Sequence, residues 1–82
     1  MKHIDLPDFR KLSDQEIEYY IEEFRDQLKG ESYTEDEINM FTFGRLNEFG
    51  ASIRQLARVS GKNRGKIERI ISKYKKFGAV SE

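Results

Sequence analysis

Two helix-start signals in the first half of this 82-residue chain constrain its fold more than any other feature. At Ser13 and again at Thr34, a hydroxyl residue is followed three positions later by a glutamate, which is the pattern of a capping box. Behind each box, apolar residues recur every three or four positions, so an amphipathic helix is predicted after each one. Gly30 and Gly50 are natural ends for these two helices.

The second half of the chain predicts two more helices. Ser52 can cap a short helix over about 53–59, and a fourth helix is predicted over about 64–76, with Gly78 as its natural end. The sequence leaves open whether the tail at 77–82 forms a strand, as it does in winged-helix proteins. Both helices carry an apolar stripe that can face a common core.

The composition combines these helices into one small domain. A chain of this length has room for one domain only, and its four tyrosines and six phenylalanines can supply a core. The absence of cysteine excludes a disulfide scaffold and a thiolate zinc site. No apolar run approaches the length of a membrane span, and the first residues lack the apolar core of a signal peptide. We therefore predict a compact, cytoplasmic, all-α four-helix domain over residues 1–82. Its first twelve residues, in which Pro7 breaks any early helix, are predicted to form an extended arm or a short turn.

Charge divides the chain into an acidic half and a basic half, although its net charge is zero. Residues 1–50 carry six Lys or Arg against thirteen Asp or Glu, a net charge of −7. Residues 51–82 carry nine Lys or Arg against two Glu, a net charge of +7. Such an asymmetry points to a choice of binding partners rather than to a fold. The alternative is that the two halves attract each other and keep the molecule soluble.

The basic half contains a pattern of two helices around a tight turn. From Ser52 to Tyr74 the chain reads SIRQLARVSGKNRGKIERIISKY. The small side chain of Ala57 allows a second helix to cross closely, and Gly61 suits a left-handed backbone conformation. Residues 52–76 resemble the helix-turn-helix of resolvases, repressors and related bacterial regulators, and SIRQLARVSG is similar to the first helix and turn of that motif. The resemblance implies a DNA-binding unit in which the last helix enters the major groove.

Two residues beside the glycine depart from that family pattern. Ser60 and Lys62 stand where the family usually places an apolar residue. Either the turn is more open in this chain, or Val59 takes over the packing role. The resemblance ends at this segment, because residues 1–50 resemble no family pattern.

The outward face of the predicted fourth helix has the residue types that DNA recognition needs. Its centre and margins carry polar and cationic residues. Glu68 lies to the side, where it can either accept from a cytosine amino group or pair with Arg64. A helix in the major groove needs donors for base edges and cations for phosphates. The predicted base-reading residues are Asn63, Arg64, Gly65, Arg69 and Ser72. The predicted phosphate contacts are Arg54, Arg58, Lys62, Lys66, Lys73 and Lys76. The plainer interpretation of both sets is a solvated helix surface.

These patterns predict a small sequence-specific protein that binds double-stranded DNA, either a transcriptional regulator or an accessory factor of a mobile element. The alternative is a protein-interaction adapter or inhibitor whose acidic helices cover a basic partner, and a third option is RNA binding. A homodimer or partner interface is expected in the acidic half. Its candidates are Tyr19, Met40 and Phe43, which face away from the main apolar stripes and which packing under the amino-terminal arm explains equally well.

Catalytic chemistry has no support in the sequence. His3 is the single histidine, and one histidine near a terminus makes neither a metal site nor an acid–base pair. The carboxylates of the first half gather at helix starts, where the helix dipole explains them. No glycine-rich phosphate loop is present. We therefore predict no enzyme, no metal, no cofactor and no small-molecule substrate.

Overall fold

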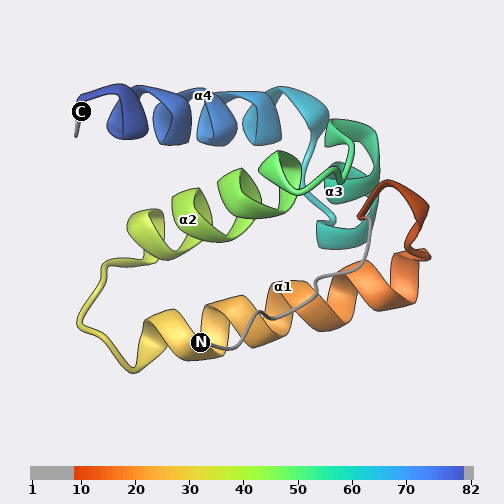
Figure 1. Cartoon of the computed structure of the whole chain (residues 1–82), viewed down its shortest axis with the longest axis horizontal. Helices are drawn as coiled ribbons and strands as arrows, with labels where there is room; N and C mark the ends of the chain where they lie inside the picture. Colours follow the sequence, from red (N-terminus) through yellow and green to blue (C-terminus); the bar gives the residue numbers. More distant parts are fainter. Residues whose placement is uncertain (1–8, 81–82) are drawn as a thin grey trace, which may run out of the picture.

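The computed structural model describes residues 9–80, which form four α-helices after one short 3₁₀ turn (Figure 1). The 3₁₀ turn η1 spans Phe9–Lys11. The helices are α1 Asp14–Lys29, α2 Glu35–Glu48, α3 Ile53–Ser60 and α4 Arg64–Val80. The described residues contain no strand, which confirms the predicted all-α four-helix fold. Within this part of the chain, no helix is both long enough and apolar enough to cross a membrane.

The helices are arranged with α2 between α1 and α4, while α3 closes one end of the molecule (Figure 1). α2 contacts both α1 and α4, and α3 contacts all three other helices. This arrangement leaves one side of α1 and one side of α4 facing outward. The two outward sides belong to the acidic and the basic half of the chain, respectively.

The helix starts lie where the capping patterns predict them. The Ser13 hydroxyl accepts from the amide of Glu16 at 3.2 Å, and the Glu16 carboxylate accepts from the amide of Ser13 at 2.9 Å. Thr34 makes the same reciprocal pair at the start of α2. Ser52 caps α3, and Gly61 ends that helix at a φ of 77°, in the left-handed region that favours glycine.

The end of α4 differs from the prediction. The helix continues through Gly78 to Val80, so the described part of the tail is helical and is no strand. The physical reason is that an interior glycine costs a helix only about 1 kcal/mol relative to alanine, which is too little to stop it. Residues 81–82 and residues 1–8 of the predicted arm or turn lie outside the described residues, and the described part of that segment contains the short turn η1.

The core takes side chains from every helix and from η1. Phe43, which was considered for a partner surface, is 1% exposed and lies in this core because α2 is covered on two sides. Val59 packs against the core and so supplies the apolar contact that is missing at Ser60 and Lys62. The buried cluster consists of Phe9, Ile17, Ile21, Phe43, Leu46, Ala51, Leu56, Ile67 and Ile71.

Gly44 sets the distance between α2 and α4. A Cβ atom at this position would lie 2.1 Å from Cγ and 2.6 Å from Cβ of Tyr74, so no side chain fits while the Tyr74 ring is in place. The Tyr74 hydroxyl donates to the carboxylate of Glu48 at 2.9 Å. Partial burial raises the pKa of Tyr74, and the hydrogen bond to Glu48 raises it further. Tyr74 thus joins the two helices by packing and by a hydrogen bond.

Thr42 is a weak point of the core, because its hydroxyl is buried without a hydrogen-bond partner. Valine has nearly the same shape and lacks the hydroxyl. Thr42→Val is therefore expected to raise the free energy of unfolding by about 1 kcal/mol, since the cost of desolvating the hydroxyl disappears. Urea denaturation followed by circular dichroism measures this. The matched control, Thr34→Val, removes a cap and should lower stability by about 1 kcal/mol. A less stable Thr42→Val variant would contradict the view that the buried Thr42 hydroxyl lacks a hydrogen-bond partner.

Candidate nucleic-acid interface

The outward side of α4 is polar and mainly cationic. Ile67 and Ile71 are buried, and they hold the opposite side of the helix against the core. Glu68 is the one carboxylate on the described part of α4, and it forms an ion pair of 3.4 Å with Arg64, one helical turn earlier. This pairing agrees with the position predicted for Glu68. The residues that are exposed on this side are Gly65, Lys66, Arg69, Ser72, Lys73 and Lys76.

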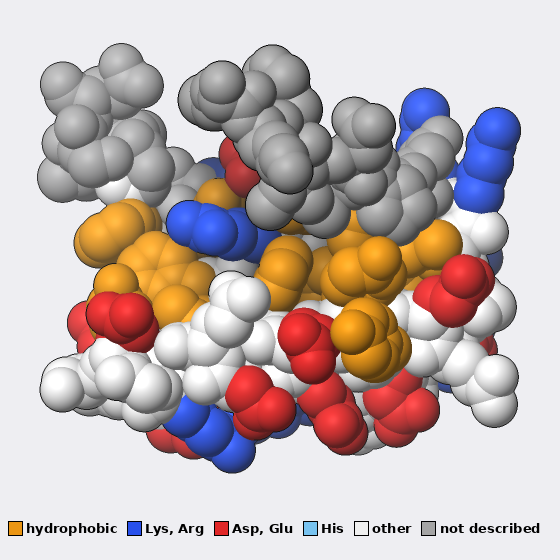
Figure 2. Space-filling view, turned by 60° about the horizontal axis from the view of Figure 1, so that its bottom comes forward, with side chains coloured by type: hydrophobic (Ala, Val, Ile, Leu, Met, Phe, Trp, Pro, Cys, Tyr) orange, Lys and Arg blue, Asp and Glu red, His pale blue; other side chains and the backbone are white. Residues whose placement is uncertain are grey.

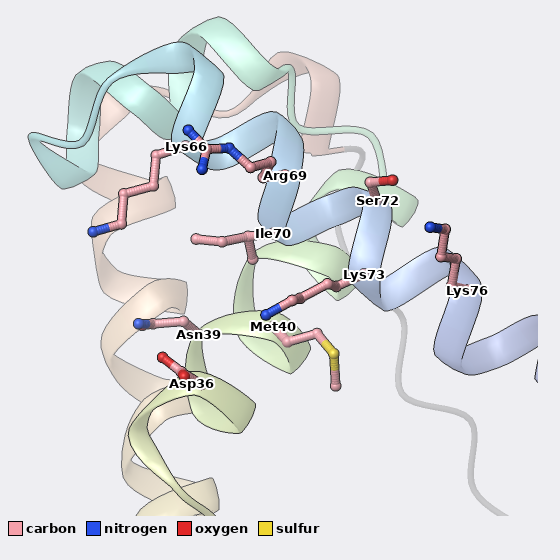
Figure 3. A pocket seen from close by; sticks show the side chains of 9 residues that line it. All are labelled: Asp36, Asn39, Met40, Lys66, Arg69, Ile70, Ser72, Lys73 and Lys76. Carbon is pink, nitrogen blue, oxygen red and sulfur yellow. The ribbon is translucent and has the colours of Figure 1, made fainter.

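A groove of about 380 Å³ runs between α4 and the first half of α2 (Figure 3). Lys66, Arg69, Ser72, Lys73 and Lys76 line it on the α4 side, together with Ile70. α2 contributes Asp36, Asn39 and Met40. Met40 is half-buried and lines this groove, on the basic side of the molecule, whereas the sequence analysis placed it on an acidic partner surface. The groove therefore combines a cationic wall with a partly apolar lining.

Asp36 and Asn39 are residues of this site that the sequence analysis missed. The carboxamide oxygen of Asn39 accepts from Arg25 of α1, and the same guanidinium donates to Glu35 at the start of α2. This hydrogen bond from Arg25 lowers the pKa of Glu35. Arg25 thereby fixes the beginning of α2 and the side of the groove that Asn39 lines. No local sequence signal could reveal this, because the three helices meet only in the folded chain.

Asn63 starts α4, which alters its predicted role. Its side-chain oxygen accepts from the backbone amide of Lys66 at 2.8 Å, as in an N-cap. A bidentate contact to an adenine edge uses both the oxygen and the nitrogen of a carboxamide. Because the cap already occupies the oxygen, Asn63 is better suited to positioning the helix than to reading a base.

Arg58 has a partner within the chain as well. Its guanidinium donates two hydrogen bonds of 2.8 Å to the carboxylate of Asp14, at the start of α1. Gln55 donates to the same carboxylate and to the carbonyl oxygen of Leu12. The hydrogen bond from Arg58, followed by that from Gln55, lowers the pKa of Asp14 to about 2. This cluster ties α3 to α1, so a phosphate contact by Arg58 would require breaking it.

The ion pair at Asp14 gives a specific pH dependence. Because the folded state lowers the pKa of Asp14 from 3.8 to about 2, the pair stabilises the fold above pH 4 and is lost as the pH falls toward 2. Asp14→Asn should therefore flatten the decline of unfolding free energy between pH 4 and pH 2. Urea titrations at several pH values measure the slope, and Arg58→Gln should flatten it in the same way. Slopes equal to that of the unaltered chain in both variants would contradict the assignment.

The remaining predicted residues lie in different surroundings. Arg54 is exposed on α3. Lys62 is half-buried and lines a second hollow together with acidic side chains of α1 and α2, among them Glu18, Glu22 and Glu35. Lys62 is thus drawn toward the acidic half and away from the groove. Tyr19 is 59% exposed and lies edge-on to Tyr20.

The acidic half presents a separate outward surface. Glu18, Glu22, Glu23 and Asp26 of α1 are exposed, and Figure 2 shows acidic side chains gathered on this side of the molecule below a band of hydrophobic side chains. Among the described residues, no group of three or more His, Cys, Asp or Glu side chains is arranged to hold a metal ion. The molecule is therefore electrically two-sided, with α1 carrying the negative side and α4 the positive side.

The geometry defines an all-α domain with a cationic helix face, and comparison with known proteins adds no family to that description. Neither a family model, nor a curated protein sequence, nor a solved structure matches the chain.

Proposed function

We propose that this chain is a small sequence-specific DNA-binding protein in which α3, the turn at Gly61 and α4 act as a helix-turn-helix, with α4 in the major groove. The observation that carries the proposal is the cationic, exposed side of α4, opposite a buried isoleucine stripe. Cations along a helix of this kind neutralise phosphates, while Arg and Ser side chains can donate to base edges. Regulation of transcription and support of a mobile element both fit such a protein.

The structural surroundings refine the roles that the sequence suggested. Arg69 and Ser72 are the best base-reading candidates, because both are exposed and both line the protein groove between α2 and α4. The phosphate contacts fall to Lys66, Lys73 and Lys76, with Arg54 on the preceding helix. Arg64 can serve either role after leaving its surface ion pair with Glu68, since such pairs contribute little. Asn63, Arg58 and Lys62 are proposed to position the helices instead.

Arg69→Ala tests the assignment of the base-reading residue. A selection from a random duplex pool should first yield a preferred sequence for the unaltered chain. Arg69→Ala should then weaken binding to that sequence by about 1–3 kcal/mol. It should also reduce the difference in affinity between the preferred sequence and an unrelated duplex. Fluorescence anisotropy with a labelled duplex measures both quantities. If this difference in affinity stayed the same, Arg69 would be excluded as a base-reading residue.

Gly65 offers a test that separates binding from stability. A Cβ at this position would meet only the side-chain oxygen of Asn63, at 3.5 Å, so the fold itself does not require a glycine here. Gly65→Ala should stabilise the chain by about 0.5–1 kcal/mol, because alanine favours the helix. If the bare backbone lies against DNA, the same change should weaken duplex binding at least about threefold, since it adds a methyl group at the contact. A variant that is more stable and binds equally well would remove Gly65 from the interface.

The acidic side of α1 supports the second candidate, a protein-interaction adapter or inhibitor. Its exposed carboxylates could cover a basic surface of another protein (Figure 2). This function predicts no duplex affinity in the micromolar range and retention of a protein partner that is lost when Glu18 and Glu22 are changed to Gln. Competition between duplex DNA and structured RNA distinguishes the third option, RNA binding by the basic face.

A further inference from the structure

An aromatic surface lies at the end of the molecule opposite α3. It consists of Tyr33 before α2, Phe41 in α2 and Phe77 in α4, and we refer to these three residues as the end patch. The Phe41 ring lies edge-on to Tyr33 and to Phe77, with centroid separations of 5.4 Å in both cases. Figure 1 shows that the α1–α2 connection and the carboxy-terminal part of α4 both lie at this end, on either side of the start of α2.

Two of the three rings of the end patch are exposed to solvent. Tyr33 is 41% and Phe77 is 52% exposed, although both rings pack against Phe41. A second aromatic group, at the other end, has exposed rings as well, with Phe49 38% exposed, but they pack around Phe9, which is fully buried. Clustered exposed aromatic rings are typical of interaction surfaces.

The charges beside the end patch indicate what can cover it. On its α4 edge, two lysines are exposed. Lys73 lies one helical turn before Phe77, and Lys76 directly precedes Phe77 in the chain. On its other edge, Glu31 is exposed two positions before Tyr33, while Glu35, two positions after it, is paired with Arg25. A twofold rotation through the patch brings the basic edge of one molecule against the acidic edge of another. The end patch is therefore complementary to itself in charge and in apolar character.

We propose that the end patch is the interface of a twofold symmetric homodimer. The Tyr33, Phe41 and Phe77 rings of two copies would pack together, with Lys76 of each copy opposite Glu31 of the other. In the dimer, Lys76 faces a carboxylate of the other copy, so the phosphate contacts proposed for α4 fall to Lys66 and Lys73. Dimer formation does not depend on DNA binding, but it would present two copies of the basic α4 face.

Sedimentation velocity of the full chain without DNA, over a range of concentrations, tests the dimer. We expect a monomer–dimer equilibrium in the micromolar range, about 1–100 μM, as suits a small interface. Phe77→Ser should raise the dissociation constant at least about tenfold, whereas Tyr19→Ser, which alters an exposed aromatic outside the patch, should leave it unchanged. A chain that stays monomeric throughout, or that loses association equally in both variants, would overturn the proposal.

A charge exchange tests the edge pairing. Lys76→Glu and Glu31→Lys should each weaken association, because each places like charges together, and the double variant should restore it to near the original value. Circular dichroism should show equal helix content in all variants. A double variant that associates no better than the single variants would contradict the twofold arrangement. Since no DNA is present, this outcome is independent of whether the chain binds DNA.

Discussion

Gly44→Ala should be one of the most damaging single-methyl substitutions in this chain. The added Cβ would lie 2.1 Å from the Cγ atom of Tyr74, far inside any normal contact. Either the Tyr74 ring leaves its place and loses its hydrogen bond to Glu48, or α2 and α4 separate. We expect a loss of about 3 kcal/mol in unfolding free energy, at the upper end for overpacking. For a domain of this size this corresponds to a fall of about 12–24 °C in melting temperature.

The control for this prediction is Gly30→Ala. A Cβ at Gly30 would meet only the carbonyl oxygen of Gln27, at 3.6 Å, and the φ of −73° suits alanine. This variant should therefore melt within a few degrees of the unaltered chain. Tyr74→Ala combined with Gly44→Ala should cost less than the two separate losses together, because the clash is gone. Strict additivity, or an intact melting temperature in Gly44→Ala, would contradict the close approach of the two helices.

Reversing two charges on α4 should have the largest effect on DNA binding. Arg69→Glu together with Lys73→Glu places two carboxylates among the groove cations. The change removes two favourable contacts and adds repulsion, so we expect duplex affinity to fall about 100-fold or more at moderate salt. Both residues are exposed, and helix content should be preserved. Fluorescence anisotropy with a labelled duplex measures the loss.

The matched control changes the net charge equally on the acidic half. Lys11→Glu with Lys29→Glu alters two exposed cations that lie outside the groove. If net charge alone governed binding, both double variants would lose the same affinity. The proposal requires a much smaller loss in the control, since neither Lys11 nor Lys29 is among the proposed DNA contacts. Equal losses would place the binding surface elsewhere or make it diffuse.

The helix starts could be predicted because capping is local. Each signal lies within four residues, and each oxygen finds the expected amide in the fold. Gly44 could not be recognised in the same way, because its importance comes from Tyr74, thirty positions later. Gly78 was misjudged for a related reason. A glycine only weakens a helix, and whether the helix ends there depends on the whole segment.

The same distinction between local signals and long-range contacts applies to the candidate site. The exposed cations of α4 follow from helical periodicity around the buried isoleucines, and the sequence predicted them correctly as outward-facing. The role of Arg58 depends on its hydrogen bonds to Asp14, which belongs to another helix. The role of Asn63 rests on a local cap, its bond to the amide of Lys66, which its position before α4 could have predicted. Phe43 was ambiguous because a helix with two apolar sides can bury both only when it is covered by neighbours on both sides. Contacts between residues that are far apart in the chain are thus what could not be predicted from the sequence alone.

The most direct test of the central claim is a salt-dependent binding titration. The full chain is titrated into a labelled duplex of about 20 base pairs at 50 mM and at 200 mM salt. If about five cations, mainly those of α4, neutralise phosphates, the logarithm of the association constant should fall with a slope near −4 to −5 against the logarithm of salt concentration. Affinity should then drop about 250- to 1000-fold between the two conditions. An absence of duplex binding at 50 mM salt, or an affinity that salt does not change, would contradict DNA binding by this protein.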